Sequence, residues 1–208
     1  MNVNRKKGND RCLLKSRIID YARNAFGNNG IRDVTMDSIA GALSISKRTL
    51  YEIFKDKEEL LLEIIRLHSV ETQAFIDSIF TETDNILDII LKIYERNFNE
   101  IKKVNRVFFD EIEKYPSVIK FLQDTRTKMA SFTILCFNRG VEQGLFRKDV
   151  NYEIIRIGMT EEMDLLLKLK AFEKYSILEI YENVVFIHIR GIATEKGLKI
   201  VEEFFQKI

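Results

Sequence analysis

The chain has 208 residues, of which 46% are hydrophobic and 31% are charged, enough to bury a packed core in one large or two modest domains. One proline and nine glycines leave few helix breakers, so the composition favours an all-α protein. No stretch reaches the uninterrupted apolar length of a membrane span, and residues 1–11 lack the apolar core of a secretory signal. We therefore expect a cytoplasmic protein with no membrane partner.

The sequence carries no recognisable catalytic or metal-binding pattern. Cys12 and Cys136 lie far apart, and neither has a second cysteine or a histidine at metal-ligand spacing. His68 and His188 are isolated, and there is no Gly-rich phosphate loop or nucleophile elbow. We expect reduced thiols, with Cys136 as a small core residue; a redox-sensing Cys136 is the alternative. The sequence thus predicts neither an enzyme nor a bound cofactor or metal.

Charge is distributed unevenly along the chain. The formal net charge is only +1, but residues 1–57 contain 12 Lys or Arg and 6 Asp or Glu, whereas residues 58–208 contain 21 and 26. Affinity for duplex DNA depends strongly on displaced counterions, so a locally basic module matters more than a nearly neutral total. The N-terminal quarter is therefore the part of the chain suited to nucleic acid.

The first predicted helix has one apolar stripe and ends at residues 28–30, where Asn-Asn-Gly is a typical helix stop. The stripe consists of Leu14, Ile18, Ala22, Ala25 and Phe26. Ahead of it, the basic residues 5–7 form either a mobile arm that touches DNA or a solvated terminus.

Residues 35–57 are predicted to form two short helices joined by a tight turn. Apolar residues recur at helical spacing in two separate sets, Met36, Ile39, Ala40 and Leu43, then Leu50, Ile53 and Phe54. Thr35 and Ser46 stand at the two N-cap positions, and Ser44 and Ile45 leave only a few residues for reversing direction. This is the arrangement of a helix-turn-helix motif.

The second helix of the pair presents polar groups away from its apolar stripe. These residues are Lys47, Arg48, Thr49, Tyr51 and Glu52. Cations, a hydroxyl and a phenol at the start of a short helix are suited to DNA phosphates and to base edges in the major groove. The alternative is an ordinary solvated helix face.

An ordered set of residues resembles the DNA-binding domain of the TetR family of bacterial transcriptional regulators. The set is Arg17–Ile19, Ala22, Phe26, Gly30, Thr35, Ile39–Ala40, Ser46, Thr49–Tyr51, Phe54 and Lys57–Leu60. Ser44 and Ile45 depart from the family's usual Gly and Val in the turn, so we expect Ser44 in an unfavourable backbone conformation. Ile53 replaces a residue that is often His or Tyr in the family, which removes a polar group near DNA. The resemblance implies that Lys57, at a helix start, approaches a DNA phosphate.

Helical patterns continue to the end of the chain. After a fourth helix at 57–80, we expect helices at 85–102, 105–114, 116–143, 152–173, 176–192 and 195–207. We predict a helix-turn-helix DNA-binding domain at 11–67 and an all-helical domain at 68–208. The arrangement is similar to the effector-binding and dimerisation domain of the TetR family.

The second domain contains residues suited to a ligand and to a partner subunit. An apolar effector cavity is predicted from Tyr94, Phe98, Phe108, Phe109, Tyr115, Met129, Phe132 and Met163, with a core role as the alternative for each. The last two long helices are apolar on more than one face. The resemblance implies a dimer interface there, formed by Met163, Leu166, Leu167, Tyr181, Val185 and Ile189.

Together with these patterns, the resemblance implies a homodimeric transcriptional regulator, a repressor that leaves a palindromic DNA operator when a small-molecule effector binds. The effector is expected to be apolar or aromatic in part. The DNA contacts are predicted to be Thr35, Ser46, Lys47, Arg48, Thr49, Tyr51, Lys55 and Lys57. Two alternatives remain: control by a protein partner or by no effector, and an enzyme that converts a small molecule in the helical bundle.

Overall fold

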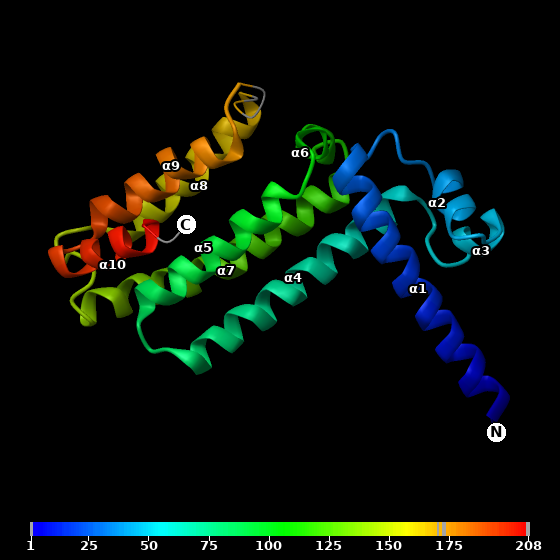
Figure 1. Ribbon diagram of the computed structural model, residues 1–208, viewed down its shortest axis with the longest axis horizontal. Coiled ribbons are helices and arrows are strands. Elements are labelled where there is room, and N and C mark those ends of the chain that lie inside the picture. The colour runs from blue at the N-terminus through cyan, green and yellow to red at the C-terminus, as the bar shows by residue number, and fades with distance from the viewer. Residues whose placement is uncertain (1, 170, 172–173, 207–208) are drawn as a thin grey trace. The chain divides into compact units, whose positions relative to one another are not determined.

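The computed structural model describes residues 2–169, 171 and 174–206, without the side chains of 2–9, 163, 164, 167, 168, 177, 178, 181, 182 and 205. Its regular elements in these residues are α-helices (Figure 1). They are α1 (Asn2–Asn29), α2 (Met36–Ala42), α3 (Lys47–Tyr51), α4 (Lys57–Glu82), α5 (Ile86–Lys102), α6 (Arg106–Ile112), α7 (Pro116–Glu142), α8 (Tyr152–Lys168), α9 (Ile177–Ile192) and α10 (Glu195–Phe205). The predicted all-α class is confirmed. Residues 5–7 belong to α1 and do not form a separate arm.

The helices divide into two compact units. The first contains Met1–Glu71 and Val104–Leu122, and the second contains Thr72–Lys103 and Gln123–Ile208. Helices α4 and α7 therefore each contribute residues to both units. The predicted boundary at residue 67 did not anticipate that 104–122, which include α6 and the start of α7, join the N-terminal helices.

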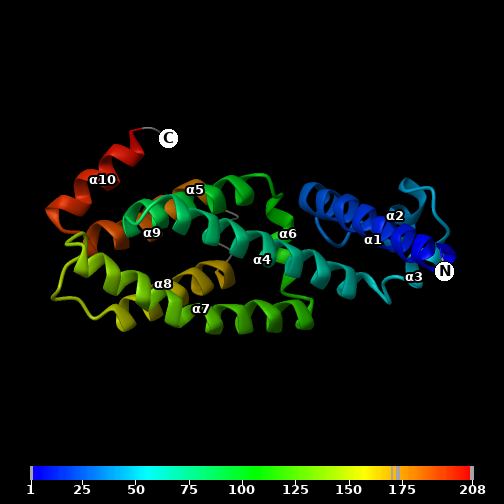
Figure 2. The same cartoon turned by 90° about the horizontal axis from the view of Figure 1, so that it is seen from below.

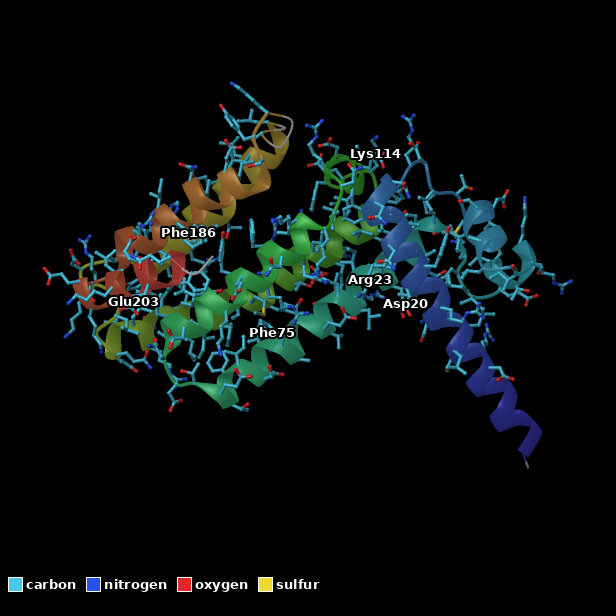
Figure 3. All side chains as sticks on the ribbon, in the orientation of Figure 1. Asp20, Arg23, Phe75, Lys114, Phe186 and Glu203 are labelled. Atoms are coloured by element: carbon cyan, nitrogen blue, oxygen red, sulfur yellow. The ribbon has the colours of Figure 1, made fainter. Side chains whose placement is uncertain are left out.

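The core of the first unit is built from the apolar stripes of its helices. Ile18, Ala22 and Phe26 of α1 are fully buried. They form one cluster with residues that include Ile39 of α2, Leu50 of α3, Leu60 and Leu61 of α4, and Val118 of α7. Arg23 of α1 also makes a two-pronged ion pair with Glu71 of α4, with N–O distances of 3.0 and 3.1 Å (Figure 3 labels Arg23 and Asp20 on α1). Apolar burial and this pair fix α1 against the start of α4.

The turn between α2 and α3 begins directly at the end of α2 and contains Ser44, the residue expected to have an unfavourable backbone conformation. The Ser44 N–H donates to the Gly41 carbonyl at 3.1 Å, and the Ile45 N–H donates to the Ala40 carbonyl at 3.0 Å. This pair of bonds requires a left-handed residue after the helix, a place that favours glycine. Ser44 occupies it with φ 53°. The prediction from the sequence at Ser44 is confirmed.

The second unit is a bundle with an aromatic core. Tyr94 of α5 stacks on Phe98 at 6.2 Å between ring centroids and meets the edge of Phe186 of α9 at 4.2 Å (Phe186 is labelled in Figure 3). α10 lies beside α5, and the ring of its Phe204 contacts Tyr94 (Figure 2). In the described part of the chain, none of the helices has the length and apolarity needed to cross a lipid bilayer.

Candidate nucleic-acid interface

The α2–α3 pair has a polar face exposed to solvent and an apolar face buried in the core of the first unit. Leu50 and Ile39 are fully buried beneath it. Opposite them, the side chains of Lys47 and Arg48 are 66% and 88% exposed, and Tyr51 is 48% exposed. Two cations and a phenol are therefore held on a rigid scaffold with their polar ends in solvent. Groups of this kind reach phosphates and base edges.

Three of the predicted contact residues build the helix starts. The Thr35 hydroxyl accepts the Ser38 N–H at 3.0 Å, and the Ser38 hydroxyl accepts the Thr35 N–H at 3.0 Å, a reciprocal capping box for α2. The Ser46 hydroxyl accepts the Thr49 N–H at 3.0 Å and lies 2.8 Å from the Thr49 hydroxyl, which caps α3. These hydroxyls fix where α2 and α3 begin.

The cations of α3 have surface partners. Lys47 pairs with Asp37 of α2, and the Arg48 Nε donates to Glu52 at 2.9 Å, one turn away. The hydrogen bond that Arg48 donates to Glu52 raises the pKa of the Arg48 guanidinium. Ion pairs this exposed contribute little to stability, so exchanging a carboxylate for a phosphate costs little. Lys55, just after α3, is also exposed.

Lys57 has a structural role that the sequence did not predict. Its Nζ donates to the Ile31 carbonyl at 2.8 Å and to the Arg32 carbonyl at 3.2 Å. Burial lowers the pKa of Lys57, although the nearby carboxylates of Glu111 and Asp33 act in the opposite direction. The ammonium group therefore ties the start of α4 to the α1–α2 turn.

Two further features of this unit lie outside the predicted set. Arg11 of α1 donates from Nη2 to the Glu52 carbonyl at 2.9 Å and so caps the end of α3. Ile53 is half-buried against the core and offers no polar group to DNA, where the family often has His or Tyr. Arg11 carried no signal in the sequence beyond its charge, because its partner is a backbone carbonyl 41 residues away.

The predicted effector residues are divided between the two units. Phe108 and Tyr115 pack against the first core, and the Phe109 ring meets Phe108 edge-on at 5.7 Å. Tyr94, Phe98 and Phe132 belong to the core of the second unit. Met129 is half-buried on α7, and the Met163 side chain lies outside the described residues. A shallow hollow of about 540 Å³ on α7 is lined by none of these residues; it is formed by Ser131, Ile134, Leu135, Asn138, Arg139 and Glu142.

Of the six predicted dimer residues, the three whose side chains the structure describes pack against their own unit. Ile189 is only 4% exposed in the core, and Val185 packs against the same core. Leu166 packs in a small cluster with Ile180 and Val184. The side chains of Met163, Leu167 and Tyr181 lie outside the described residues. Among the described side chains of α8 and α9, the large apolar ones that face solvent are Ile154, Ile157, Leu165 and Ile187, at 50 to 66% exposure.

Comparison with known proteins matches the geometry of the first unit. Residues 18–64 match the model of the family described as bacterial regulatory proteins, tetR family. This segment, which includes the helix-turn-helix, is therefore similar to the DNA-binding domain of the TetR family. It is 24% identical over 153 residues to the HTH-type transcriptional repressor KstR2 of Mycobacterium tuberculosis, covering 68% of this chain and 73% of the relative.

Solved structures with the TetR fold extend the match beyond the helix-turn-helix. The ketosteroid transcriptional regulator KstR2 of M. tuberculosis superposes with a TM-score of 0.60 at 20% identity, covering 88% of this chain and 96% of that one. A transcriptional regulator from Saccharomonospora viridis in complex with choline gives 0.69 at 15% identity, covering 88% and 100%. These structures show the shared fold, and the family match together with the repressor relatives supports a DNA-binding transcriptional regulator.

Proposed function

We propose that the protein is a homodimeric repressor that binds a palindromic operator and leaves it when a small-molecule effector binds. The observation that carries the proposal is the α2–α3 pair, whose exposed cations and phenol stand on a buried, capped scaffold. Each subunit presents one such pair. A two-fold dimer places two recognition helices on one face of DNA about one helical turn apart, which requires a palindromic site.

The DNA contacts that we propose fall into two groups. Lys47, Arg48 and Tyr51 read the major groove, because their side chains extend from the first turns of α3 into solvent. Lys55 and the backbone N–H groups at the starts of α2 and α4 bind phosphates. Thr35, Ser46 and Thr49 hold the helix starts and contribute through them, and Lys57 holds the adjoining turn.

The homodimer is supported by the apolar stripe on the outer face of α8. Ile154, Ile157 and Leu165 repeat at helical spacing and are each at least half exposed, and Ile187 of α9 is 57% exposed. Large exposed apolar side chains gathered on one helix face are typical of an interaction site. A second copy of the chain covers it in our proposal, with α8 and α9 of both subunits forming four packed helices.

Control by a small molecule is supported by the relatives and by the aromatic content of the second unit. The solved neighbours include a ketosteroid regulator and a choline complex, and the second unit contains Tyr94, Phe98, Phe132 and Phe186. We propose an effector that is apolar or aromatic in part. A coupling free energy of about 1 to 3 kcal/mol between effector and operator changes DNA affinity by about 5 to 150 fold, which is enough to relieve repression.

The test is selection of bound fragments from genomic DNA by the purified protein at two salt concentrations, followed by sequencing. We expect enrichment of one palindrome at both concentrations, with lower total binding at the higher one. The enriched site is then the probe for a screen of apolar and aromatic small molecules. Uniform binding without any enriched motif would contradict the operator, and enrichment of a single unpaired half-site would contradict the dimer.

A further inference from the structure

The backbone of the turn between α1 and α2 is hydrogen-bonded to a carboxylate of α6. Glu111 is only 9% exposed. Its Oε2 accepts the Ile31 N–H at 2.6 Å and the Arg32 N–H at 2.7 Å. Hydrogen bonds to an ionised acceptor are short and roughly twice as strong as neutral ones. A residue 80 positions further along the chain therefore fixes the backbone just ahead of the helix-turn-helix.

The other end of α6 binds the end of α1. The Asn105 N–H donates to the Gly27 carbonyl at 2.6 Å, and its side-chain Nδ2 donates to the Asn28 carbonyl at 3.0 Å. Carbonyls in the last turn of a helix have no intrahelical partner and need one from outside. α6 thus provides donors to the end of α1 and an acceptor to the turn that follows.

Lys57 binds the same two residues through their carbonyl groups. The carbonyls of Ile31 and Arg32 accept from its ammonium group, while their N–H groups donate to Glu111. The turn is therefore bound between a carboxylate of α6 and an ammonium group of α4. The Ile31–Arg32 peptide is bound at both ends, because its N–H donates to the carboxylate and its C=O accepts from the ammonium group.

Glycine at position 30 lets α6 approach this closely. Gly30 has φ +82°, a left-handed conformation that L side chains rarely adopt. A Cβ at this position would lie 2.9 Å from Val107 Cγ1 and 3.0 Å from the Glu111 carboxylate. The backbone of the turn and the side chains of α6 are in direct contact, with no room for an intervening group.

We propose that Glu111 is a positioning residue for DNA binding, which sets the α1–α2 turn and thereby the orientation of the α2–α3 pair. The segment it holds ends three residues before Thr35, the N-cap of α2. Glu111 acts through this backbone and touches no DNA. This role of Glu111 rests on the proposed function in one respect, because the operator serves as the DNA probe in the experiment.

The experiment compares E111Q and E111A with E113Q in the full-length protein. Glu113 is an exposed carboxylate two residues further along, so E113Q is a matched loss of charge. Affinity is measured for the enriched operator and for a random duplex of equal length, well below each variant's unfolding midpoint. We expect E111Q to weaken binding to both DNAs about 5-fold and E111A about 10- to 100-fold. E113Q should stay within about twofold of the wild type.

Two readouts separate positioning from a general loss of stability. The amide protons of Ile31 and Arg32 should exchange faster in E111Q, while those of the α2 and α3 interiors keep their protection. In a double-mutant cycle with Lys57→Met, the losses of affinity should be non-additive, since both side chains bind the Ile31–Arg32 peptide. Additive losses, or unchanged exchange at these two amides, would overturn the proposal.

Failure of this proposal is distinguishable from failure of the proposed function. If the wild type prefers no palindrome, the operator model is wrong, and the random duplex still reports whether E111A weakens binding. If the wild type selects an operator but folded E111A binds both DNAs as tightly as the wild type, Glu111 has no positioning role.

Discussion

At the scale of single residues, the two thiols lie in opposite environments. Cys12 is exposed on α1, and Cys136 is buried in the core of the second unit, where burial raises its pKa to about 11. Because the thiolate is the reactive form, only about one Cys136 in a thousand is reactive at pH 8. We expect one fast-reacting thiol per chain in titration with a disulfide reagent, and none in C12S. Two fast thiols in the native protein would revive the redox-sensing alternative.

Arg48 is the residue with the clearest expected effect on site discrimination. It extends from α3 with 88% exposure, and its partner Glu52 lies on the same helix. Arg48→Ala should reduce the preference for operator over random DNA by about 1 to 3 kcal/mol, because a side chain that reads bases is lost. Competition binding with both DNAs measures this difference. Lys120→Ala removes another exposed cation of the same unit and should leave the preference unchanged.

At the scale of elements, the end of α1 requires glycine at position 30, and we expect no other residue to be tolerated there without a loss of stability. Gly30→Ala adds a Cβ against α6 in a left-handed conformation. The backbone strain and the overpacking together should lower the free energy of unfolding by about 2 to 4 kcal/mol. Denaturant unfolding checks the value.

The control for this substitution is Gly41→Ala. Gly41 lies within α2, and a Cβ there meets nothing within 4 Å. Alanine is the better helix former, so this variant should be more stable by about 0.5 to 1 kcal/mol. Equal destabilisation by both variants would mean that the loss comes from the helix-turn-helix in general and not from the contact with α6.

Helix boundaries were predictable because caps and stripes are local. Asn85, Asn105 and Ser176 cap α5, α6 and α9 within one or two residues of the predicted starts. The positive φ of Ser44 was also predictable, since two short helices need a left-handed residue between them. What one position requires of its immediate neighbours can be inferred from a single sequence.

At the scale of the whole molecule, contacts between distant segments could not be inferred in this way. Glu111 is one of three acidic residues within four positions, and nothing in that run distinguishes the carboxylate that binds Ile31 and Arg32. Lys57 was predicted to bind phosphate, but its ammonium group binds carbonyls because α4 starts beside the α1–α2 turn. Ile189 was predicted to lie at a dimer interface, but an apolar helix turned towards its own core has the same spacing.

The prediction at the scale of the whole molecule concerns the dimer interface. Ile187 of α9 and Leu135 of α7 belong to the same unit and are equally exposed, at 57% and 58%. If α8 and α9 form the interface, Ile187→Glu buries an unpaired charge between subunits. The dimer should then dissociate more readily by roughly 30-fold, equivalent to about 2 kcal/mol. Sedimentation over a range of protein concentrations measures the dissociation constant.

Leu135→Glu is the matched control, and it should leave the dimer intact. Because each subunit supplies one recognition helix, Ile187→Glu should also weaken binding to the palindrome while affinity for a single half-site stays unchanged. That pattern ties the assembly to the function, since a folding defect would lower both affinities. The opposite result, with Leu135→Glu dissociating the dimer and Ile187→Glu leaving it intact, would place the interface on the outer face of α7.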